Sequence, residues 1–110
     1  MATAYKILGQ ILAPSSSAYG TLYTTSGVSA VVSTIIVSNQ STAPATYSIA
    51  VAGTANTPTV PDATLLAAGV LIQPNTTTTY TLGLTLESGK YIRVSSSSTS
   101  VGFQAYGSEQ

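Results

Sequence analysis

The sequence predicts an all-β protein, folded as a single antiparallel β-sandwich of about eight strands. Apolar and polar residues alternate with a period of two along most of the chain. Gly, Pro, Asn and Ser interrupt this alternation at short intervals, and no segment has the i, i+3, i+4 spacing of an amphipathic helix. We therefore expect a jelly-roll-like sandwich, with an Ig-like sandwich as the alternative. The 110 residues fit one domain, residues 1–110.

The N-terminal half contains four expected strands, at 5–12, 18–25, 28–39 and 45–51. The segment 1–14 is interpreted either as the domain's own first strand or as an arm that adds a strand to a neighbouring sheet. The third segment is rich in β-branched residues and apolar on both faces, so we expect it at the centre of a sheet, covered on both sides. The fourth alternates cleanly, with Tyr47 and Ile49 facing the core.

Four more strands are expected in the C-terminal half, at 64–72, 76–86, 91–95 and 101–106. Gly69 marks an expected bulge in the first of these. The strand at 76–86 places Thr on one face and mostly Leu on the other. The longest irregular segment, 53–62, is an expected surface loop.

The composition of the chain argues against most catalytic mechanisms and most kinds of metal site. The chain has no His, Cys or Trp, and only three basic and three acidic residues. No Ser therefore has a His base, and the sequence has no Gly-x-Ser-x-Gly elbow. The carboxylates Asp62, Glu87 and Glu109 are too scattered to predict a glycosidase pair or a calcium site. We predict a non-enzymatic protein without cofactor or metal.

The charge and hydropathy of the chain also limit the kinds of partner that it is expected to bind. A formal net charge of zero gives no electrostatic footprint for nucleic acid or anionic lipid. The longest apolar run, at 65–72, is far shorter than the ~20 residues of a spanning helix. The N-terminus lacks the basic start and apolar core of a signal peptide, so we expect synthesis in a cytoplasm. Strands with so few charges are prone to pair edge to edge, which favours burial in an assembly.

The best candidates for a partner interface lie near the N-terminus, where apolar and aromatic side chains precede the central strands. Tyr is enriched at interfaces, and an apolar strand near a terminus can pair with a neighbour. In the first strand, Tyr5, Ile7 and Ile11 are expected on one face and Leu8 and Leu12 on the other. The full candidate set is Tyr5, Ile7, Leu8, Ile11, Leu12, Tyr19 and Tyr23.

Four stretches carry a resemblance to a known family. They are the run Ala-Val-Val-Ser-Thr-Ile-Ile-Val-Ser-Asn at 30–39, the run Ile-Gln-Pro-Asn-Thr-Thr-Thr-Thr-Tyr at 72–80 with Glu-Ser-Gly-Lys-Tyr-Ile-Arg-Val at 87–94, and the segment 101–109. From about Leu22 to its end, the chain resembles a small β-domain of tailed-bacteriophage virion proteins, of the type found in phages of cyanobacteria and other marine bacteria. In one departure, Lys90 stands where related sequences often carry an acidic residue.

The resemblance implies a virion structural part without catalytic residues. Similar domains occur in tail fibres, baseplates and capsid decorations. Because the chain is compact and has no fibrous extension, we predict a capsid decoration, or cement, protein that binds the major capsid protein and forms a homo-oligomer. A trimer is the expected oligomer on an icosahedral lattice. The alternatives are a tail, baseplate or fibre component and a receptor- or glycan-binding module that uses the loop 53–62 or the strand faces.

Overall fold

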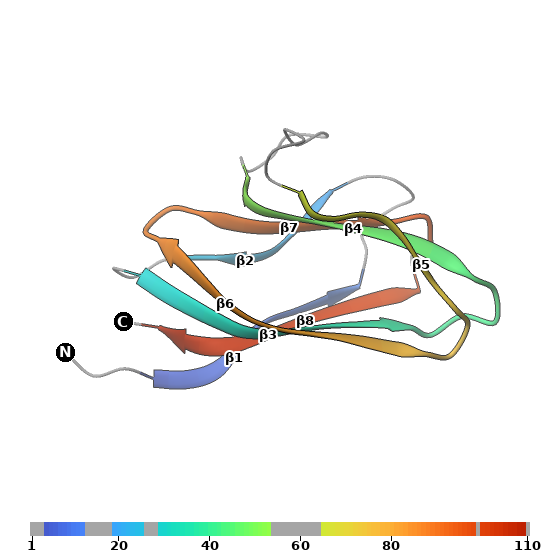
Figure 1. Cartoon of the computed structure of the whole chain (residues 1–110), viewed down its shortest axis with the longest axis horizontal. Helices are drawn as coiled ribbons and strands as arrows, with labels where there is room; N and C mark the ends of the chain where they lie inside the picture. The colour runs from blue at the N-terminus through green and yellow to red at the C-terminus, as the bar shows by residue number, and fades with distance from the viewer. Residues whose placement is uncertain (1–3, 13–18, 26–28, 54–64, 99, 110) are drawn as a thin grey trace.

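The computed structural model describes residues 4–12, 19–25, 29–53, 65–98 and 100–109, and all the regular structure in them is β-strand. The strands form two four-stranded antiparallel sheets, in the order β1-β8-β3-β6 (sheet A) and β2-β7-β4-β5 (sheet B). Figure 1 shows sheet B as the upper layer and sheet A as the lower layer. The strands are β1 (Ala4–Leu12), β2 (Gly20–Thr24), β3 (Ser29–Asn39), β4 (Ala45–Gly53), β5 (Leu65–Ile72), β6 (Thr77–Glu87), β7 (Tyr91–Ser96) and β8 (Val101–Glu109).

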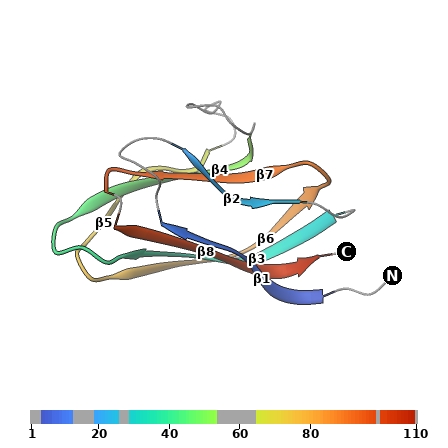
Figure 2. The same cartoon turned by 180° about the vertical axis from the view of Figure 1, so that it is seen from behind.

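The order of strand pairing is that of a chain folded back on itself and rolled into two layers. β4 pairs with β5, β3 with β6, β2 with β7 and β1 with β8, so pairs of increasing sequence separation alternate between the sheets. This order is compatible with a jelly roll. An Ig-like sandwich instead places its first two strands side by side in one sheet, whereas β1 and β2 lie in different sheets (Figure 2).

The prediction of an all-β antiparallel sandwich is confirmed, and each expected strand is present. The expected bulge at Gly69 is also confirmed. The register of β5 against β4 shifts there, Gly69 has φ 59°, and its N–H donates to Ser48 Oγ. The expected loop at 53–62 falls almost wholly outside the described residues, as do Pro14 and Asp62.

The core fills the space between the two sheets. At its centre the Tyr47 ring packs edge-on against Phe103 and Tyr80, with ring centroids 6.3 and 6.4 Å apart. The Tyr47 and Tyr80 hydroxyls are hydrogen-bonded to each other, and burial raises the pKa of Tyr47 above its usual value. Because the two rings come from opposite sheets, this pair ties the layers together. Aliphatic residues complete the centre of the core: Val32, Ile35, Val37, Ile49, Ile92, Val94 and Val101.

A row of bulges crosses sheet A and changes which residues face inward. The register of β1 shifts between Ile7 and Gly9, and that of β3 shifts between Val32 and Thr34 against both of its neighbours. In β3 the even position Val32 is fully buried before the shift, and the odd position Ile35 is fully buried after it. Between these positions β3 has one residue more than β8. This extra residue keeps apolar side chains on the inner face on both sides of the shift.

The prediction that the 28–39 strand is central and covered on both sides is half right. β3 does lie between β8 and β6. Its second face is open, however, because Val31 is 41% exposed on the side of sheet A that faces away from sheet B. The inner face carries Val32, Ile35 and Val37, whereas the β-branched residues Val31, Thr34 and Ile36 lie on the outer face, which no described strand covers.

Candidate functional site

The outer face of sheet A is built from residues that alternate with the core positions. On β8, Phe103, Ala105 and Gly107 are buried and face sheet B. Gln104 and Tyr106 alternate with them and therefore point away from sheet B. The strand registers place their neighbours on the same face. We call this set the neutral face: Ile7, Gln10 and Leu12 of β1, Gly102, Gln104, Tyr106 and Ser108 of β8, Val31, Thr34, Ile36 and Ser38 of β3, and Thr77, Thr79, Thr81 and Thr85 of β6.

None of the residues of the neutral face is ionisable at neutral pH. The nearest charges are Glu87, which follows Thr85 on the same outer face opposite Ser29, and Lys6, which lines the rim of the face beside Ile7. Large apolar side chains are exposed on the face, with Ile7 52% accessible near the middle of β1 and Leu12 53% accessible at its end. A sheet face with exposed aliphatic groups and charges only at its margin is poorly protected against association.

Two shallow hollows lie along the neutral face. The first has a volume of about 360 Å³ and is lined by Lys6, Ile7, Ser33, Tyr106 and Gly107. The second, of about 310 Å³, lies toward the other end, where amide and hydroxyl side chains gather around Leu12. Its polar lining consists of Gln10, Ser38, Gln40 and Gln104. The Tyr106 hydroxyl, which donates to Gln104 Oε1, connects the two hollows. The face thus offers apolar contact at one end and uncharged hydrogen-bonding groups at the other.

The predicted interface residues of the first strand are divided between the two faces of β1. Ile7 and Leu12 point outward, opposite Tyr106 and Gly102, whereas Leu8 and Ile11 are half-buried and pack against the core. The expected division, with Ile7 beside Ile11 and Leu8 beside Leu12, was wrong because the bulge between Ile7 and Gly9 shifts the alternation by one residue. The side chain of Tyr5 lies outside the described part of the chain.

Tyr19 and Tyr23 are both engaged within the chain. The Arg93 guanidinium donates to the Tyr19 carbonyl oxygen at 2.9 Å and lies 6.0 Å from the centre of the Tyr19 ring. Tyr23 is only 6% exposed. It faces the core beside Leu22, instead of on the opposite face, because the register of β2 shifts between Thr21 and Tyr23. We therefore leave Tyr23 out of the surface proposed below.

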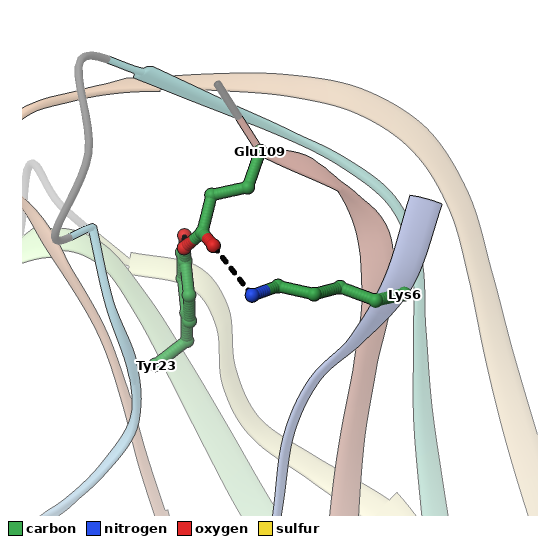
Figure 3. A network of polar contacts seen from close by, with 3 residues as sticks. All are labelled: Lys6, Tyr23 and Glu109. Atoms are coloured by element: carbon green, nitrogen blue, oxygen red, sulfur yellow. Dashed lines mark hydrogen bonds and ion pairs between the residues drawn. The ribbon is translucent and has the colours of Figure 1, made fainter. Parts of the chain in front are cut away.

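A polar network ties β1 and β8 of sheet A to β2 of sheet B. Glu109, at the end of β8, pairs with Lys6 Nζ of β1 at 2.6 Å and accepts a hydrogen bond from the Tyr23 hydroxyl of β2, as Figure 3 shows. These two hydrogen bonds, with Lys6 as the larger cause, hold the pKa of Glu109 below its usual value. Burial, and then the Glu109 carboxylate, raise the pKa of Tyr23. The network anchors the first strand and the last strand at one place.

Replacing Glu109 with Gln is expected to lower the stability at neutral pH, and this loss should shrink in acid. A folded-state pKa below the unfolded value means that ionised Glu109 stabilises the fold above its unfolded pKa, about 4.5, and that this contribution disappears as the pH falls through the folded pKa. Urea unfolding of both proteins at neutral and acidic pH measures the difference. Glu87→Gln is the matched control, since Glu87 is exposed at the end of β6. An equal effect of the two variants at every pH would contradict the network.

The described residues offer little other chemistry. They contain no group of three or more His, Cys, Asp and Glu residues that could hold a metal ion. No helix in the described ranges is long and apolar enough to cross a membrane. The residues that sequence reasoning missed are those of β3 and β8 on the neutral face, above all Val31, Gln104 and Tyr106. The alternation at 101–106 was a usable signal for the last two.

Comparisons with known proteins give a distant structural likeness. No protein-family model matches the chain, and no curated protein matches it. Two solved structures align with 97% of the chain, each at 19% sequence identity and a TM-score of 0.45. Both are described as a pentameric capsid protein isolated from metagenomic phage sequences, and the chain spans 64% of one and 65% of the other. At this similarity no function is transferred, so the proposed function rests on the chain's own residues.

Proposed function

We propose that the chain is a non-enzymatic structural protein of a bacteriophage virion, and that it acts there as a capsid decoration protein. The observation that carries this proposal is the neutral face, on which Ile7, Leu12 and Val31 are 52%, 53% and 41% exposed and which has charges only at its margin, at Lys6 and Glu87. Interface cores are depleted of charged residues, whereas free surfaces normally carry many of them. The resemblance of the sequence to a small β-domain of phage virion proteins supports a location in the virion.

The proposed mechanism is the bridging of adjacent shell subunits. The neutral face lies on the major capsid protein, where its exposed aliphatic side chains lose contact with water. The amides of Gln10 and Gln104 and the hydroxyls of β3 and β6 donate and accept hydrogen bonds without the desolvation cost of a charge. Because the chain binds the assembled shell and not the free subunits, it stabilises the assembled state by mass action.

The proposed assembly is homo-oligomeric, with three-fold association favoured on an icosahedral lattice. The chain is made in the host cytoplasm and ends in the virion. A formal net charge of zero gives it no overall electrostatic attraction to nucleic acid or anionic membrane. The N-terminal strand need not leave its own sheet for this role, since β1 pairs with β8 along its length.

Copy number in purified virions tests the proposal against its nearest alternative, a tail, baseplate or fibre component. We expect a ratio to the major capsid protein of one to one or one to a small integer, measured by quantitative mass spectrometry. A few copies per particle would instead indicate a tail, baseplate or fibre component. The absence of the chain from virions would contradict a virion role altogether.

A receptor- or glycan-binding module is the second candidate function, and one observation favours it. A hollow of about 200 Å³ on sheet B is lined by Tyr19, Tyr47 and five hydroxyl side chains: Thr46, Ser48, Ser95, Ser96 and Ser97. An aromatic ring beside hydroxyls suits sugar recognition, and Tyr19 supplies that ring because the Tyr47 ring is buried in the core. If the hollow binds a glycan, Tyr19→Ala abolishes host-cell adsorption and leaves particle stability unchanged. Normal adsorption of this variant would exclude Tyr19 from such a site.

A further inference from the structure

The two sheets have four edge strands, and three of them are protected against pairing with another chain. β1 carries Lys6 and a bulge, and it approaches β2 so closely that the position of a Cβ on Gly9 lies 2.0 Å from the Leu22 carbonyl oxygen. β2 has five residues and a register shift. β5 is interrupted by two register shifts, one at Gly69 and one between Leu65 and Ala67. Lysines, bulges and short edges are the usual means of preventing edge-to-edge association.

β6 lacks this protection along its first half. It is the outer strand of sheet A, has 11 residues, and contains no Pro, Lys or Arg. Its run 77–81 keeps an unbroken register with Ser38–Thr34 of β3, and its one irregularity lies beyond Thr81. An outer strand presents alternate N–H and C=O groups to its open side. No described strand pairs with that side of β6.

The geometry points to a second copy of this chain as the partner of β6. We propose that two β6 strands pair antiparallel about a two-fold axis at Thr79, so that each chain extends the other's sheet A. Thr79 then lies opposite its counterpart, and Thr77 lies opposite Thr81 on the outer face. On the inner face, Thr78 lies opposite half-buried Tyr80, whose ring contacts the core.

The sequence of the run favours self-pairing over an unrelated strand. An isologous contact needs a surface that is complementary to itself, and 77–81 places Thr at both ends and at the centre of its outer face. Threonine pairs across antiparallel strands are favourable. No like charges meet, because the two Glu87 carboxylates would be roughly 50 Å apart at the normal rise per residue.

The contact would join the neutral faces of two copies into one larger uncharged surface, because Thr77, Thr79 and Thr81 belong to that face. It is compatible with three-fold association, since an icosahedral lattice contains both two-fold and three-fold axes. The inference does not depend on the virion role. A chain that forms this pair but is absent from capsids would contradict the proposed function and leave the β6 contact standing.

A single-cysteine cross-link tests the pairing directly, because the chain has no native cysteine. Residues directly opposite in an antiparallel pair lie within disulfide range. The Thr79→Cys variant is therefore expected to form a covalent dimer on mild oxidation. Thr85→Cys is the control, because Thr85 is exposed on the same strand but would lie roughly 40 Å from its counterpart. Equal cross-linking of both variants, or none in either, would overturn the proposal.

Charge exchange at Thr79 provides a second test that does not depend on oxidation. Thr79→Lys and Thr79→Glu each place like charges face to face at the axis, so each variant alone should self-associate about tenfold or more weakly than the native chain. An equimolar mixture should recover association, as measured by sedimentation velocity. If Thr79→Lys associates as strongly as the native chain, the axis is not at Thr79.

Discussion

Gly9→Ala is expected to destabilise the fold by about 3 kcal/mol or more, which is a large fraction of the stability of a small domain. The reason is a backbone contact and not a preference for unusual dihedral angles. A Cβ at this position would lie 2.0 Å from the carbonyl oxygen of Leu22 and 3.1 Å from its carbonyl carbon. A side chain could rotate away, but these atoms belong to the backbone of β2, so β1 and β2 would have to separate. Thermal unfolding should show a Tm lower by about 12 °C or more.

Gly83→Ala is the matched control, because a Cβ there meets nothing within 4 Å and Gly83 also lies in a strand of sheet A. We expect its effect on unfolding to be within about 0.5 kcal/mol of zero. Equal stability of the Gly9→Ala and Gly83→Ala variants would contradict the close approach of β1 to β2.

Val31→Glu is expected to weaken binding to the shell about 30-fold or more, while leaving the fold intact. Val31 is 41% exposed on the neutral face, so the free protein tolerates a charge there. In the assembled particle the carboxylate would be removed from water without a partner, which costs several kcal/mol. Titration of each variant onto particles depleted of the chain, with bound copies counted on quantitative gels, measures the change in affinity.

The control for Val31→Glu is Leu71→Glu, which makes the same kind of change on the other sheet. Leu71 is 59% exposed, and it pairs with Thr46 on the outer side of sheet B. We expect this variant to bind as the native chain does. A stronger loss of binding in Leu71→Glu than in Val31→Glu would indicate that the contact surface lies on sheet B.

The sequence was sufficient to predict the strands because period-two alternation and turn residues are local signals. The turn at 87–90 shows this, since Gly89 has φ 83° and the Lys90 N–H donates to the Glu87 carbonyl, as the Glu-Ser-Gly-Lys order predicts. The strand order was not predictable in the same way. β1 and β8 pair residues as far apart as Ala4 and Glu109, and nothing local to either strand encodes that choice.

The candidate site was less predictable than the fold, because each bulge reverses the faces of the residues that follow it. A single extra residue in β1 moved Leu12 onto the outer face and Ile11 toward the core. In β3 the shift lets Val32 before it and Ile35 after it both face the core, and Val31 lies on the outer face of a segment that was expected to be covered on both sides. The bulge at Gly69 was the one predicted from the sequence, because a glycine interrupts an apolar run there. The shift in β3 falls at Ser33, which gives no such signal.

The most direct test of the central claim is the accessibility of the neutral face in intact virions. Val31→Cys and Leu71→Cys variants each carry one thiol, because the native chain has none, and both positions are exposed in the free chain. The rate of maleimide labelling is compared for each variant, free and incorporated in particles. We predict that the thiol of Val31→Cys becomes protected in the particle while that of Leu71→Cys stays reactive. Equal labelling of Val31→Cys in the free chain and in the particle would contradict the neutral face as the contact surface.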